Sequence, residues 1–165
     1  MTNDLTLPQN EIIVGEQLYS ETISIILASA QQELRVFDQD LSRGGFHSKK
    51  NSELLQRFLN TNPNSRLTII LQGTEFLKKE CPRLTNLLQV YGHKITIYET
   101  NQSVKHAKDC FIVADSQHYI KRIHIDQTRF KYGLSEVATT NTLNTRFNEL
   151  LEETQDTVTA TTLGL

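Results

Sequence analysis

The segment from His106 to Asp126, HAKDCFIVADSQHYIKRIHID, places several reactive side chains around one apolar run. His106 and Lys108 precede the run, and Asp115 follows it. An imidazole can act as a nucleophile or as a proton donor, and an ammonium group can hold phosphate oxygens. The three residues are therefore candidates for chemistry at a phosphodiester.

The next stretch, HYIKRIHI, has the alternation of a β-strand, which puts Arg122 and His124 on one face. A guanidinium group can grip a phosphate with its planar fork, so Arg122 is a candidate phosphate ligand. His124 is a further catalytic candidate. The structural alternative is a buried ion pair in which Asp38 or Asp115 holds Arg122 at a strand end.

A third group of candidates lies in FDQDLSRGGF, where Asp38 and Asp40 end an earlier strand. Arg43 precedes two glycines that could form a phosphate cradle. The two carboxylates could bind Mg²⁺, but the pattern has no third oxygen ligand, and turn or capping hydrogen bonds explain them equally well. His118 and His124 would be roughly 20 Å apart on an extended strand, too far to share a zinc ion. We expect no metal and no cofactor.

Hydrophobic periodicity predicts helices that alternate with strands. The helices are expected within residues 15–32, 51–60, 74–92 (divided at Pro82) and 141–153, and the strands at residues 33–41, 66–72, 94–100, 109–115 and 118–125. The early alternation favours crossover connections, and a turn at Ser116 and Gln117 makes the last two strands a hairpin. The prediction is an α/β fold with a mixed, mostly parallel sheet flanked by helices.

The chain of 165 residues is long enough for one domain, expected at residues 15–154. Residues 1–14 would be an N-terminal extension and residues 155–165 a mobile C-terminal tail. The net charge of −2 and the pI near 6.2 predict no overall attraction to nucleic acid or to anionic membranes, so such binding requires a local patch. Two separated cysteines and the lack of a signal peptide or long apolar run indicate a cytoplasmic protein without membrane insertion.

Several segments, RVFDQDL, ELLQRFL, CPRLTNLL, DCFIVAD and HYIKRIHIDQ, carry a family resemblance over most of the chain. The element order resembles one half of a phospholipase D-like domain. The sequence is more closely similar to an uncharacterised bacterial family of phospholipase D-like domains that lack the intact His-x-Lys-x4-Asp motif. This resemblance implies the fold and leaves the activity unassigned.

In the active enzymes that the chain resembles, the motif His attacks phosphorus and the Lys holds phosphate oxygens. Counting from His106 puts Lys108 in place, but the Asp position falls on Val113, two residues before Asp115. If Asp115 is aligned instead, the His and Lys positions fall on Lys108 and Cys110. Protonated Lys is not a nucleophile and Cys carries no positive charge, so neither can perform the original role.

Three functions follow from these observations. The preferred one is a non-catalytic binding or assembly module for a phosphate-bearing partner. The second is a phosphodiesterase or nuclease with a rearranged His, Lys and Arg site. The third is nucleic-acid binding without chemistry, based on six Lys or Arg between Lys105 and Lys131, although charges also protect a hairpin edge from pairing. Since active relatives need two half-sites, the resemblance also implies a homodimer.

Overall fold

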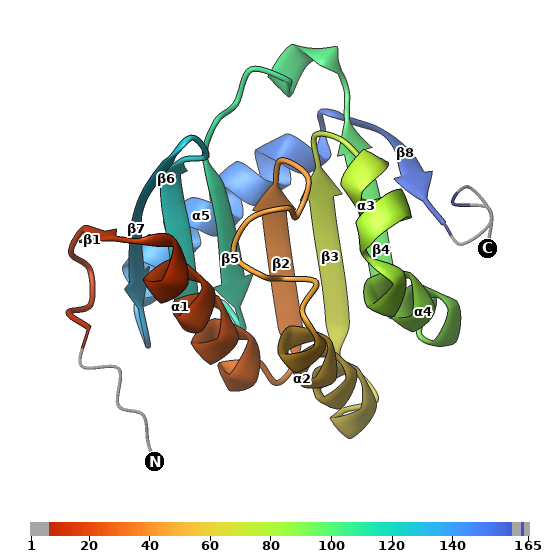
Figure 1. Ribbon diagram of the computed structural model, residues 1–165, viewed down its shortest axis with the longest axis horizontal. Helices are drawn as coiled ribbons and strands as arrows, with labels where there is room; N and C mark the ends of the chain where they lie inside the picture. The colour runs from red at the N-terminus through yellow and green to blue at the C-terminus, as the bar shows by residue number, and fades with distance from the viewer. Residues whose placement is uncertain (1–6, 160–162, 164–165) are drawn as a thin grey trace.

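A computed structural model describes residues 7–159 and residue 163 (Figure 1). The helices are α1 (Glu16–Ser29), α2 (Lys49–Thr61), α3 (Glu75–Glu80), α4 (Pro82–Val90) and α5 (Val137–Leu151), with a 3₁₀ turn η1 (Gln102–Val104). The strands are β1 (Ile13–Val14), β2 (Glu33–Asp38), β3 (Arg66–Leu71), β4 (Ile95–Thr100), β5 (Cys110–Ala114), β6 (His118–His124), β7 (Gln127–Gly133) and β8 (Thr154–Val158). The predicted helices and strands are all present, and β1, β7 and β8 are additional.

The strands form one mixed sheet in the order β1-β7-β6-β5-β2-β3-β4-β8. Only the β2–β3 and β3–β4 pairs are parallel, and the other five pairs are antiparallel. The prediction of a mostly parallel sheet was therefore wrong. The physical reason is that β5 pairs with β2 in the antiparallel direction, and the three strands missing from the prediction add antiparallel pairs at both edges.

Helices cover both faces of the sheet, as predicted (Figure 1). Helices α1 to α4 lie on one face, where Ile26 and Leu27 of α1 join Val36 and Ile69 in the larger hydrophobic cluster. Helix α5 lies on the opposite face and packs there through a smaller cluster, which contains Leu143, Phe147, Phe37, Phe111, Val113 and Tyr119. Alternating residues of β2 and β5 thus contribute to different clusters, as the period of a strand requires.

Local capping explains several boundaries. Ser48 is the N-cap of α2, and its hydroxyl accepts from the amide of Asn51 at 3.2 Å, so the helix begins before the expected residues 51–60. Pro82 begins α4, as predicted, since the first helical position needs no amide donor. The buried Lys94 ammonium donates to the carbonyls of Leu59 and Asn62 at 2.6 and 2.7 Å, which satisfies backbone acceptors at the end of α2.

Both ends of the domain extend the sheet. In the expected N-terminal extension, Ile13 pairs with Phe130 of β7 and the amide of Asn10 donates to Tyr132. Residues 154–158, most of which were expected in a mobile tail, form β8 beside β4, with Val158 opposite Ile97. The periodicity did not predict this strand, since β-branched Thr and Val suit a strand even where no long apolar run marks it. Residues 160–162 and 164–165 of that tail lie outside the described residues.

Candidate functional site

The carboxyl end of β2 and the start of β5 meet at one edge of the sheet. Because these strands are antiparallel and Phe37 pairs with Phe111, Asp38 lies beside Cys110. Tyr19 of α1 approaches from the covering helix layer, with its hydroxyl 3.5 Å from the Cys110 sulfur. We call these residues, together with Arg122 and Glu16, the Asp38 cluster.

Arg122 is the most buried charged group of the Asp38 cluster, with a side chain that is 1% exposed. Its fork donates to both carboxylate oxygens of Glu16 at 3.0 and 2.8 Å. It also donates to the carbonyls of His124 and Ile125 at 3.3 and 2.9 Å, and its guanidinium carbon lies 4.9 Å from the centre of the Tyr19 ring. The guanidinium is thus engaged by internal partners.

Glu16 is the solvent-exposed partner of this ion pair, with a side chain that is 56% exposed. The Thr128 hydroxyl donates to it at 2.6 Å, and the hydrogen bonds from Arg122 lower the pKa of the carboxyl. Arg122 therefore forms a buried ion pair, but its partner is Glu16 and not Asp38 or Asp115. Glu16 is the residue that sequence reasoning missed, since a helix-starting Glu is ordinary and nothing local links it to β6.

Burial controls the protonation of the Asp38 cluster. It raises the pKa of the Asp38 carboxyl from 3.8 to about 6. It also raises the pKa of the Cys110 thiol and of the Tyr19 hydroxyl well above their ordinary values. Cys110 therefore stays a neutral thiol at pH 7 and is not an activated nucleophile.

The loop between β2 and α2 closes over the Asp38 cluster. Gly44 has a φ of 83° and lies against Tyr19 and Ile23, where a Cβ atom would come within 2.8 Å of the Tyr19 ring. The amide of Leu41 donates to Asp38 at 2.9 Å, which ties the start of this loop to β2. The cavity that remains has a volume of about 10 Å³, room for at most one water molecule.

Asp40 and Arg43, both candidates from this loop, have structural partners. Asp40 accepts from the amide and the hydroxyl of Ser42 at 2.9 and 2.6 Å, which is the turn role that the sequence left open. Arg43 lies 3.7 Å from the Asp126 carboxylate at the surface and also lines the small cavity. Within the described residues, no three His, Cys, Asp or Glu side chains are grouped to hold a metal ion.

Replacing Asp38 with Asn should stabilise the protein at neutral pH. The folded pKa of about 6 lies above the ordinary 3.8, so the folded state binds the proton more tightly. The stability from this group is fully present below pH 3.8 and is lost as the pH rises through 6. We expect Asp38→Asn to raise the free energy of unfolding by roughly 2–3 kcal/mol at pH 7.5, with the difference shrinking toward pH 4.

Urea unfolding at pH 4.5 and 7.5 measures this difference, with the exposed Asp126→Asn as the control. An Asp38→Asn protein that is no more stable than the wild type at pH 7.5 would contradict the assignment of a raised pKa.

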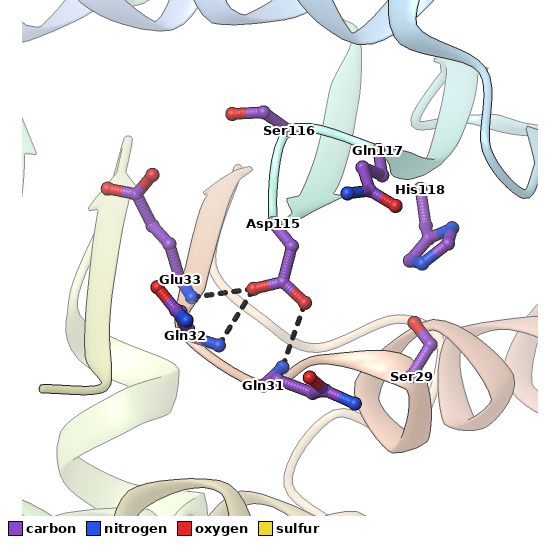
Figure 2. Close-up of a pocket in the computed structure, with 8 residues that line it drawn as sticks. All are labelled: Ser29, Gln31, Gln32, Glu33, Asp115, Ser116, Gln117 and His118. Carbon is purple, nitrogen blue, oxygen red and sulfur yellow. Dashed lines mark hydrogen bonds between the residues drawn. The ribbon is translucent and has the colours of Figure 1, made fainter. Parts of the chain in front are cut away.

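Asp115 lies at the other end of the sheet, far from the Asp38 cluster in the fold. It occupies the β5–β6 turn with a φ of 56°, and Figure 2 shows its carboxylate pointing at the start of β2. The carboxylate accepts from the amides of Gln31, Gln32 and Glu33 at 2.9, 2.8 and 2.8 Å. Asp115 therefore does not hold Arg122, because Arg122 pairs with Cys110 at the start of β5 and Asp115 follows the end of that strand.

An open depression of about 400 Å³ surrounds Asp115 (Figure 2). Its lining includes Ser29, Gln117 and His118. The imidazole of His118 accepts from the amide of Ser135 at 3.0 Å, and both Asp115 oxygens are engaged. Asp115 and His118 therefore stabilise the backbone that borders the depression.

The remaining candidates lie in the loop before β5 and at the end of β6, two segments that are joined where the amide of Ile125 donates to the carbonyl of Lys108 at 2.8 Å. His106 and Lys108 are exposed in the loop before β5. The imidazole of His124 accepts from the amide of Asp126 at 3.1 Å within the β6–β7 turn. The structure thus brings Asp38, Cys110 and Arg122 close together and places Asp115 at the opposite sheet end.

Comparisons with known structures give the class of fold. TrmBL2, described as an archaeal chromatin protein with a novel mode of DNA binding, matches with 10% identity and a TM-score of 0.64, over 92% of this chain and 55% of TrmBL2. Nuc from Salmonella typhimurium, a phospholipase D family member, matches with 9% identity and a TM-score of 0.56, over 88% of this chain and 97% of Nuc. NucT from Helicobacter pylori matches with 8% identity and a TM-score of 0.57, over 87% and 96%. The chain has a phospholipase D-like fold.

The family is defined by sequence as well. A family model described as a domain of unknown function, DUF7931, matches residues 16–161, and the chain belongs to this family. No curated protein matches the chain. Among the described residues, no helix is long and apolar enough to cross a membrane.

Proposed function

We propose that this protein is a non-catalytic phospholipase D-like module that binds a phosphate-bearing partner. The observation that carries the proposal is Cys110, which is 3% exposed and kept protonated by its raised pKa. In the alignment on Asp115, Cys110 occupies the place of the motif Lys, and the exposed Lys108 occupies the place of the motif His. The protonated ammonium group of Lys108 is not a nucleophile, and the neutral thiol of Cys110 is not a cation that could hold a phosphate.

The state of Arg122 also supports a non-catalytic role. Its N–H groups donate to Glu16 and to two backbone carbonyls. A phosphate could bind Arg122 only by displacing the Glu16 carboxylate. The adjoining cavity of about 10 Å³ cannot admit a phosphate group. A phosphodiesterase with a rearranged site would need Arg122, Lys108 and a histidine around an open pocket, and these contacts speak against it.

Hydrolysis of bis(p-nitrophenyl) phosphate tests the proposal. We expect the purified protein, His106→Ala and His124→Ala to show the same rate as buffer, because no activated nucleophile faces an open pocket. Phosphodiester hydrolysis that scales with wild-type protein and disappears in one variant would overturn the non-catalytic role. Circular dichroism of each variant serves as the control for folding.

The homodimer and the cytoplasmic location implied by the sequence stay predictions. A homodimer would place the edge residues of two copies around a composite cleft, as the resemblance to two-half enzymes implies.

Nucleic-acid binding without chemistry is a second candidate, favoured by a group of cations on the β6–β7 hairpin. The description of TrmBL2 as a DNA-binding chromatin protein is compatible with this candidate. The cations of the β6–β7 hairpin would determine which phosphate-bearing partner the module binds.

A further inference from the structure

The outer strands β7 and β1, with the second half of β6 from Lys121, have a sheet face that α5 leaves open. Helix α5 packs mainly on β4, β5 and β6, and it runs behind the sheet in the view of Figure 1. On the α5 side of the outer strands, Val14 is 65% exposed and Ile123 is 37% exposed. Exposed aliphatic side chains on an open sheet face indicate an interaction surface.

Three cations lie on this same face. Lys121 of β6 stands directly opposite Lys131 of β7, and Arg129 follows two residues away, opposite Val14. Like charges directly opposite on neighbouring strands destabilise a sheet. Among the described residues, no carboxylate lies within ion-pair distance of these cations. None of the three cations is therefore neutralised by a direct ion pair among the described residues.

A hollow of about 660 Å³ lies beside the two lysines. Its lining includes Ile123, Tyr119 and one carboxylate, Glu136, which accepts from the amide group of Asn10 at 3.0 Å. Tyr119 is buried and donates to Asn10 at 2.6 Å. The hollow thus has an excess of positive charge and offers no exposed aromatic ring to stack on a base.

We propose that Lys121, Arg129 and Lys131, with Val14 and Ile123 beside them, bind the phosphodiester backbone of nucleic acid. We call this surface the Lys121 face. Opposed strand residues are about 5 Å apart and alternate residues about 7 Å apart, so the three charges match a ligand with closely repeated anions. Phosphates of a nucleic acid have this property, and the aliphatic side chains would contact its sugars.

This inference rests on the proposed role as a binding module and names its partner. Because the contacts are to phosphates and sugars, binding should be independent of base sequence. Three neutralised phosphates predict a slope of about −2.7 for log affinity against log salt, which is about a 40-fold loss between 50 and 200 mM KCl.

Fluorescence anisotropy with a labelled 20-base-pair DNA duplex, in EDTA, tests the inference. The double variant Lys121→Gln/Lys131→Gln should lose at least tenfold in affinity at 50 mM KCl, and its salt slope should fall by about 1.8. Its melting temperature should be unchanged or higher, since the repulsive pair is removed. The matched control, Lys49→Gln/Lys50→Gln on exposed positions of α2, changes net charge equally and should bind within twofold of the wild type.

A parallel titration with single-stranded DNA identifies which form of nucleic acid the face binds. Tighter binding of a single strand of the same sequence would assign the face to single-stranded nucleic acid, and tighter binding of the duplex would assign it to double-stranded DNA. Absence of binding to both at 50 mM KCl, equal loss in the control variant, or displacement by polyglutamate at equal charge concentration would overturn the inference. Cleavage of the probe, seen on a gel, would instead contradict the non-catalytic role and leave the binding face intact.

Discussion

Replacing Arg122 with Met will lower the free energy of unfolding by about 3 kcal/mol. The methionine keeps most of the apolar stem, but it removes the fork that joins Glu16 to the carbonyls of His124 and Ile125. These carbonyls lose a charged donor, and the Tyr19 ring loses its cation. The expected loss is large because the Arg122 side chain is almost completely buried.

Urea unfolding followed by circular dichroism measures the effect, with Arg129→Met as the control. Arg129 is an exposed Arg on the neighbouring strand, so its replacement should change the free energy of unfolding by less than about 0.5 kcal/mol. A stable Arg122→Met protein that has lost binding to inorganic phosphate would contradict the structural role and restore Arg122 as an anion ligand.

Replacing Asp115 with Ala will destabilise the protein by about 3–4 kcal/mol. The carboxylate accepts from three consecutive amides, at Gln31, Gln32 and Glu33, and thereby joins the β5–β6 turn to the start of β2. Alanine also fits poorly at a φ of 56°, a left-handed conformation that Asp tolerates better. Water can replace part of the lost hydrogen bonding, since the amides border an open depression.

Thermal unfolding of Asp115→Ala beside Asp126→Ala separates this role from a general loss of surface charge. Asp126 is an exposed turn residue, and its replacement should leave the melting temperature nearly unchanged. Asp115→Asn should retain part of the stability because one amide oxygen can still accept. Equal melting temperatures for the wild type and Asp115→Ala would refute the role of this carboxylate in fastening the turn.

Local patterns in the sequence were sufficient for much of the architecture. Alternation predicted that Arg122 and Tyr119 lie on opposite faces of β6, and they do, with Arg122 toward α1 and Tyr119 toward α5. The division of the third helical segment at Pro82 was also confirmed. The strand β7 was missed because Arg129 and Lys131 are typical of a solvated loop, although Phe130 and Tyr132, which alternate with them, are buried.

The candidate site was harder to predict, because it depends on which strand ends meet. Asp38 and Asp115 each follow an apolar strand, and the sequence suggested that they could serve one site. The β2–β5 pair is antiparallel, so it places them at opposite ends of the sheet and leaves Cys110 beside Asp38. A hydrophobic pattern contains the period of each strand but not the direction of its partner.

The sequence by itself determined the five helical segments, the five central strands and the distance of two residues by which Asp115 misses the His-x-Lys-x4-Asp spacing from His106, since these depend on neighbouring residues and on period. Only the tertiary structure decided that Glu16 neutralises Arg122 and that Lys121 opposes Lys131. Both pairings join segments that come together only when α1 packs on the sheet and β7 pairs with β6. The charge arrangement at both places therefore depends on long-range contacts, and no local segment of the sequence is sufficient to predict them.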